Sequence, residues 1–240
     1  MPDLSSWLAP PLLLIVALVA LGPLRDRVHR RRLAARGAAY RDFIYREFLA
    51  YMWPVAGIVV ACWVAAGQRL ETLGFAHEPS TGLAIAWGVT ALLALYSTWS
   101  TVQVRRHDKA RESLERQIDA GGNIDFVRPE SPGQLKGFLA LSVTAGVTEE
   151  IVFRGFLIMT LALVMPLWAA ALLSLTLFVL AHSYQGWRGM LTILPISTVL
   201  TVLFVISGSL WPVIVLHIVV DVTGGLMIYE VVKSKARAAA

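Results

Sequence analysis

Six ionisable side chains lie in otherwise apolar stretches of the second half of the chain. They are Glu149, Glu150, Arg154, His182, His217 and Asp221. A charge near the centre of a bilayer costs about 2.5 kcal/mol or more, so such residues usually face the interior of a helix bundle and mark function. The set combines imidazoles with carboxylates, the groups that hydrolytic sites use for proton transfer. The sequence therefore indicates a polar site inside apolar helices.

The spacing of the first three residues predicts a division of roles. Residues four apart share one face of a helix, with about 6 Å between their Cβ atoms, so Glu150 and Arg154 are expected to form a structural ion pair. Glu149 lies about 100° around the helix from Glu150 and points elsewhere. Glu149 is therefore predicted to be the free carboxylate, available as a general base.

The remaining groups predict how water is held and activated. His217 and Asp221 are four residues apart on one helix, while Phe178 precedes His182 by the same interval and is expected to be an aromatic support beside the site. In one interpretation, His182, His217 and Asp221 bind Zn²⁺, which acidifies a bound water. In the other, metal-free interpretation, Glu149 and His182 activate water, while His217 and a protonated Asp221 stabilise the oxyanion. Both interpretations end in attack of water on a carbonyl group.

The composition predicts helices that cross a membrane. Of 240 residues, 57% are hydrophobic and 15% are charged, compared with about a quarter charged in soluble domains. The mean hydropathy is +0.65. Spans of about 20 apolar residues are predicted at roughly 7–24, 47–66, 82–104, 136–162, 167–183, 190–206 and 210–231. The expected fold is an all-α, polytopic membrane bundle of about seven transmembrane helices with a polar intramembrane cavity.

The distribution of cations predicts the orientation of the chain. Nineteen of the 21 Lys and Arg residues lie in segments that seven spans place on one side; Arg69 lies on the other side and Arg154 within a span. By the positive-inside rule, the N-terminus is outside and the C-terminus is cytoplasmic. This distribution accounts for the basic pI without a nucleic-acid partner and predicts contact with membrane lipids. The Ala- and Arg-rich composition suggests a prokaryotic cytoplasmic membrane.

After residue 136 the predicted spans carry ionisable residues, whereas the spans before it carry almost none, and this change suggests three parts. Residues 1–135 are predicted to be an N-terminal transmembrane scaffold with basic cytoplasmic loops, residues 136–231 the site-bearing core, and residues 232–240 a basic cytoplasmic tail. His29, His77 and His107 fall in predicted loops and are expected to be surface residues.

Three motifs resemble those of a known family. TEEIVFRGFL (148–157) resembles the EExxxR motif of the CPBP family, the CAAX prenyl protease and bacteriocin-processing (Abi-type) intramembrane endopeptidases. FVLAHSYQGWRG (178–189) resembles the FxxxH motif of this family, and SGSLWPVIVLHIVVD (207–221) its third motif. The three motifs occur in the expected order, and together they are far more specific than EExxxR alone.

The resemblance implies a hydrolytic function at the predicted site. It implies an endopeptidase that cleaves a membrane-associated or prenylated-like protein or peptide, with Glu149 activating water, His182 helping to hold it, and His217 and Asp221 completing the site. Glu150 and Arg154 would brace the first motif. The family has been described both as metalloproteases and as metal-independent glutamic proteases, so Zn²⁺ and metal-free mechanisms both stay open. The alternative is a transporter, or an immunity or scaffold protein that uses the polar cluster for binding.

Overall fold

A computed structural model describes residues 4–76, 78–120 and 126–238. The chain is 88% helical, and the described residues contain no strand. The helices are α1 (Leu4–Arg36), α2 (Arg41–Ala65), α3 (Thr81–Arg106), α4 (Asp108–Ala120), α5 (Pro132–Glu149), α6 (Met159–Leu161), α7 (Leu167–Ala181), α8 (Gly186–Ser207) and α9 (Leu210–Ala238). Shorter 3₁₀ turns are η1 (Ala38–Tyr40), η2 (Leu70–Leu73) and η4 (Ser183–Gln185), and the segment η3 (Glu150–Ile158) is π-helical.

The predicted fold class, a polytopic helical membrane bundle, is confirmed. Five of the described helices are long and apolar enough to cross a membrane, and the apolar helix α7 is shorter. The five are Ser6–Arg36, Ala38–Ala65, Thr81–Arg106, Ser183–Ser207 and Leu210–Arg237. The predicted fourth span corresponds to α5, η3 and α6 in succession. The count of seven spans is not confirmed.

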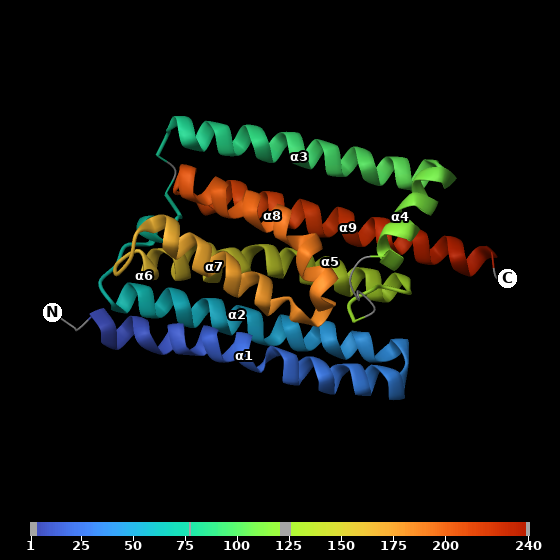
Figure 1. Cartoon of the computed structure of the whole chain (residues 1–240), viewed down its shortest axis with the longest axis horizontal. Helices are drawn as coiled ribbons and strands as arrows, with labels where there is room; N and C mark the ends of the chain where they lie inside the picture. The colour runs from blue at the N-terminus through green and yellow to red at the C-terminus, as the bar shows by residue number, and fades with distance from the viewer. Residues whose placement is uncertain (1–3, 77, 121–125, 239–240) are drawn as a thin grey trace.

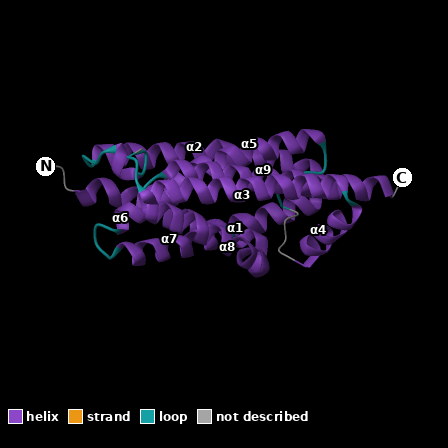
Figure 2. Cartoon of the chain, turned by 90° about the horizontal axis from the view of Figure 1, so that it is seen from above, coloured by secondary structure: helices purple, strands orange, loops and turns teal. Residues whose placement is uncertain are grey.

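The long helices run side by side along one axis (Figure 1). Helix α1 packs against α2 and α7, α5 packs against α2 and α9, and α3 packs against α8 and α9. Figure 2 shows the bundle as an elongated body, with the start of α1 and the end of α9 at opposite ends. Large apolar side chains remain exposed on the outside of α3, where Leu92, Leu95 and Trp99 are 66%, 70% and 58% exposed. Such an apolar exterior suits contact with lipid, because lipid imposes no cost on exposed hydrocarbon.

The helix that carries the first motif changes its winding at the motif. Ser131 caps α5 by accepting a hydrogen bond from the backbone N–H of Gln134, and Pro132 occupies the first turn, where no N–H is required. From Glu150 to Ile158 the backbone is π-helical, and all nine residues are buried. π-helical turns are uncommon and occur frequently at functional sites. Glu149 and Glu150 therefore lie at the junction between two kinds of helix.

Two glycines allow α9 to approach α5 closely. A Cβ atom placed on Gly146 of α5 would lie 2.5 Å from the side chain of Ile218, and one on Gly225 of α9 would lie 2.2 Å from the ring of Phe138. Both distances are shorter than any normal contact, so each position requires a glycine for this packing. Ile218 is the neighbour of His217, and Gly146 lies one helical turn before Glu149 and Glu150. The glycine contact thus brings the two halves of the polar cluster together.

The expectation that His29 is a surface residue is wrong. Helix α1 continues through the basic segment to Arg36, and His29 is only 3% exposed. Its ring nitrogens lie 3.2 Å from the hydroxyl of Tyr40 and 3.3 Å from a carboxylate oxygen of Glu47. His107 is exposed, as expected, at the end of α3. His77 lies outside the described residues.

Candidate active site

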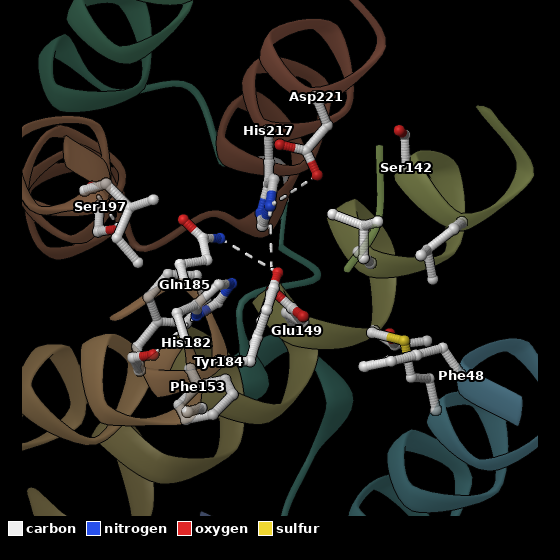
Figure 3. Close-up of a pocket in the computed structure, with 18 of the residues that line it drawn as sticks. Phe48, Ser142, Glu149, Phe153, His182, Tyr184, Gln185, Ser197, His217 and Asp221 are labelled. Carbon is white, nitrogen blue, oxygen red and sulfur yellow. Dashed lines mark hydrogen bonds and ion pairs between the residues drawn. The ribbon is translucent and has the colours of Figure 1, made fainter. Parts of the chain in front are cut away.

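The bundle contains a cavity of about 480 Å³, and the helices that carry the three sequence motifs all contribute to its lining. Its walls come from α1, α2, α5, η3, α7, η4, α8 and α9. Glu149, His182, His217 and Asp221 all lie on its lining, so residues separated by up to 72 positions in the chain face one space. Figure 3 shows these four side chains converging, with Glu149 at the end of α5, His182 just after α7, and His217 and Asp221 both on α9. Phe178 also lines the cavity, whereas Glu150 and Arg154 lie behind its wall.

Glu150 links Arg154 to His217. Its Oε1 accepts a hydrogen bond from Arg154 at 2.9 Å, the ion pair that the spacing predicts. The same oxygen lies 2.6 Å from Nδ1 of His217. Glu150 and Arg154 are 0% and 1% exposed, so neither charge is hydrated. The ion pair between the carboxylate and the guanidinium compensates for the loss of water around both groups. Because Nδ1 of His217 faces a carboxylate, this nitrogen carries the proton, and Nε2 is directed to the cavity.

Glu149 faces His217 across the cavity. Its Oε2 lies 3.9 Å from Nε2 of His217, beyond hydrogen-bond distance. Among the described residues this oxygen is buried and has no hydrogen-bond partner. Buried carboxylate oxygens normally have partners, and a water molecule can bridge two polar groups at such a separation. The two atoms therefore frame a position suited to one water molecule.

His182 and Phe178 pack against each other at the end of α7, with their ring planes tilted by 41°. Nδ1 of His182 lies 2.9 Å from the backbone carbonyl of Phe178 and donates to it, which leaves Nε2 free. The rings of Phe178 and His182 have centroids 4.6 Å apart. The guanidinium of Arg154 lies 4.1 Å from the centroid of Phe178, within the range of a cation–π contact. The ring of Phe178 thus lies between the guanidinium of Arg154 and the imidazole of His182.

The side chain of Asp221 is more exposed than those of Glu149 and His217. It is 37% exposed, and its Oδ2 lies 3.6 Å from Nε2 of His217. No group of three or more His, Cys, Asp or Glu side chains among the described residues is arranged to hold a metal ion. The zinc site formed by His182, His217 and Asp221 stays a prediction, and the reaction proposed below uses protein groups only.

Tyr184 and Gln185 also face the site. They belong to the aromatic-Gln-Gly segment that follows the motif histidine, but the sequence analysis predicts no role for either side chain. Gln185 donates a hydrogen bond from Nε2 to the hydroxyl of Tyr184 at 3.1 Å. Both residues line the cavity, and Figure 3 shows them beside His182. Arg30 of α1 donates a hydrogen bond to the backbone carbonyl of Tyr184, which ties this turn to the N-terminal helix. Tyrosine and glutamine after a motif histidine carry no charge, so the search for ionisable residues in spans misses them.

Comparison with known proteins supports the family resemblance. Residues 131–223 match the family model described as type II CAAX prenyl endopeptidase, Rce1-like. The matched segment contains Glu149, His182, His217 and Asp221, together with the Glu150–Arg154 pair. Searches of curated proteins and of solved structures gave no significant match.

Proposed function

Because residues 131–223 carry a domain of the CAAX-type intramembrane endopeptidase family, we propose that this chain hydrolyses a peptide bond with Glu149 as general base. One observation carries the assignment. A buried carboxylate oxygen of Glu149, without a hydrogen-bond partner among the described residues, faces Nε2 of His217 at 3.9 Å on the wall of a cavity. No contact or distance among the described residues favours a transporter or a scaffold protein in the same way.

In the proposed reaction, a water molecule sits between Glu149 and His217, and His182 helps to hold it. Glu149 takes one proton from the water, whose oxygen forms a bond to the carbonyl carbon of the substrate. The electron pair of the carbonyl bond moves to its oxygen. In this reaction His217, which lies among Glu149, Glu150 and Asp221, carries a proton on both ring nitrogens. Its Nε2–H and a protonated Asp221 stabilise this oxyanion. Glu149 then returns the proton to the amide nitrogen as the carbon–nitrogen bond breaks.

The buried pair behind the cavity wall sets the orientation of His217. Glu150 accepts from Nδ1 of His217 and is itself held by Arg154. A carboxylate on one ring nitrogen fixes which nitrogen faces the reaction, as in other hydrolytic sites. Glu150 and Arg154 are therefore positioning residues, whereas Glu149 and His217 contact the reacting atoms.

The substrate that suits this site is a membrane-associated or prenylated-like protein or peptide. Most of the cavity lining is apolar, and α1, α2 and α9 all contribute apolar side chains to it. A substrate segment entering such a cavity loses little by leaving lipid, whereas a highly charged segment would have to shed its hydration. Membrane lipids are the expected surroundings of the enzyme.

Replacing Glu149 by glutamine tests the assignment. The amide keeps the shape of the side chain but cannot take a proton, so we expect cleavage of a membrane-associated peptide to fall by about 100-fold or more. Glu112→Gln makes the same chemical change on an exposed face of α4 and is the control. Equal thermal unfolding curves for the two variants in detergent would show that both are folded. Full activity of a folded Glu149→Gln protein would rule out this role.

A chelator distinguishes the catalytic types. If protein groups alone activate the water, activity persists after dialysis against a strong zinc chelator, and purified protein contains zinc well below one equivalent. Loss of activity on chelation, with recovery on adding Zn²⁺, would instead support the ligand set of His182, His217 and Asp221.

A further inference from the structure

One face of α1 forms an apolar wall of the cavity that ends in a cation. The α1 residues on the lining are Ile15, Leu18, Val19, Gly22 and Arg25. Their spacing follows a single helical face, and the helix rises by about 15 Å between the first and the last of them. A bound molecule lying along this face of α1 would contact apolar side chains over most of its length and the guanidinium of Arg25 at one end.

Arg25 lacks a carboxylate partner in the described part of the chain. It is half-buried, has no ion pair among the described residues, and its Nε is buried without a hydrogen-bond partner. The guanidinium lies against two aromatic rings, 4.8 Å from the ring centroid of Phe48 and 5.2 Å from that of Tyr51, and Arg25 also donates a hydrogen bond to the Tyr51 hydroxyl. An incompletely paired cation at the edge of an apolar cavity is costly unless an anion joins it.

The second cation described on the lining differs in this respect. Arg128 donates to a carboxylate oxygen of Glu130 at 3.0 Å, so its charge already has a neighbour of opposite sign. The next residue after Arg25, Asp26, is buried on another face of α1 and attracts Arg25 electrostatically without forming a direct ion pair with it. Arg25 is thus the cation on the described lining that is positioned to receive an anion from outside.

We infer that Arg25 binds a carboxylate at the end of an apolar substrate segment that lies along the α1 wall. This inference rests on the proposed function, because the segment would occupy the cavity that holds Glu149. A guanidinium binds a carboxylate through charge-assisted hydrogen bonds, and the aromatic faces of Phe48 and Tyr51 keep it oriented. Arg25 would therefore determine which end of a bound segment faces the catalytic groups.

A pair of apolar peptides that differ only at the C-terminus, carboxylate or carboxamide, tests this inference. For the wild-type protein in neutral-lipid vesicles, we expect kcat/KM to be about 10- to 100-fold higher for the acid. In Arg25→Gln this ratio should fall to nearly one, and Arg25→Lys should restore part of it. Arg27→Gln is the matched control, since Arg27 is exposed on α1 and does not line the cavity. A ratio that is the same in Arg25→Gln and the wild type would overturn the inference.

Two further measurements distinguish a peptide carboxylate from a lipid phosphate, and binding from hydrolysis. Repeating the assay with increasing anionic lipid tests the headgroup phosphate as the ligand. If Arg25→Gln changes only the lipid dependence and leaves the acid-to-amide ratio intact, Arg25 binds lipid and the inference fails. Binding of the same two peptides, measured by fluorescence anisotropy on the wild type and Arg25→Gln, gives the ratio without hydrolysis. Selective binding of the acid without any cleavage would support the carboxylate site and refute the proposed protease function.

Discussion

Nδ1 of His217 lies 2.6 Å from Oε1 of Glu150, and the same oxygen accepts the hydrogen bond from Arg154. One carboxylate therefore joins a catalytic candidate on α9 to a buried cation on η3. The first motif contains two adjacent glutamates with separate environments. Glu149 faces the cavity, and Glu150 supports the residue on the opposite side of it.

Glu150→Gln should reduce both stability and activity. The variant leaves Arg154 buried without a charge partner, and breaking a buried ion pair from one side typically costs about 3–5 kcal/mol. It also removes the carboxylate that orients His217. We expect a large drop in unfolding temperature in detergent, together with loss of cleavage. In contrast, Glu149→Gln should retain nearly wild-type stability, and equal stability of the two variants would contradict the separate roles.

Gly146→Ala should displace α9 from α5. The added Cβ would lie 2.5 Å from Cγ1 of Ile218 and 3.0 Å from its backbone nitrogen. Overpacking of this kind costs about 1–3 kcal/mol, and it would shift His217 relative to Glu149. Gly57→Ala in α2 is the control, because nothing lies within 4 Å of a Cβ there and alanine favours a helix by about 1 kcal/mol over glycine. Thermal unfolding and cleavage rates should fall for the first variant only.

Tyr184→Phe should lower kcat more than it changes KM. The variant removes a hydroxyl that accepts from Gln185 and whose own proton is available to the cavity. Loss of one hydrogen-bond donor near a developing oxyanion costs about 100-fold in kcat in a well-studied protease, and we expect a loss of about 10- to 100-fold here. Tyr96→Phe on the exposed face of α3 is the comparison, since Tyr96 is 62% exposed. An unchanged kcat for Tyr184→Phe would exclude a role for this hydroxyl.

Glu130 should make stability depend on pH under acidic conditions. Partial burial raises the pKa of Glu130, but hydrogen bonds from Arg128 and Arg41 outweigh it and hold the pKa below its usual value. A lowered pKa in the folded state means that the charged form stabilises the fold above the unfolded pKa of about 4.3. This contribution is lost as the pH falls through the folded pKa.

Unfolding temperatures of wild type and Glu130→Gln, measured from about pH 6 down to about pH 3, check this prediction. The wild type should be more stable at the upper end, and the difference should shrink as the pH falls. The effect is modest, because Glu130 is only partly buried and its side chain is 29% exposed. A difference that stays constant over this range would show that the charge of Glu130 does not contribute.

The fold class follows from sequence patterns because local hydropathy determines which segments are apolar helices. Helices lie at each of the predicted ranges, but the fourth range consists of three successive elements with a π-helical turn at its centre. The residues between Glu150 and Ile158 show an ordinary apolar pattern, so nothing in it signals a change of winding. All nine residues of this segment are buried against other parts of the bundle, and single-segment patterns contain no information on such contacts.

The site could be predicted as a set of residues but not as a network. Glu149, His182, His217 and Asp221 face one cavity, as their intramembrane positions suggest. The contact between Glu150 and His217 joins residues 67 positions apart, and helical spacing identifies only neighbours on the same helix. The burial of His29 was missed because its neighbours are arginines, which are good helix formers and extend α1 beyond its apolar part.

The N-terminal helices complete a chamber whose reactive groups come from the family-matched segment. Residues of α1 and α2 line the cavity beside Glu149, and Arg30 is bonded to the turn that bears Tyr184. A truncated protein containing residues 131–223 alone would keep every candidate catalytic group yet expose them sideways to acyl chains. Recombinant work on this protein therefore needs the first two helices, and sequence changes within them are able to alter what the chamber accepts.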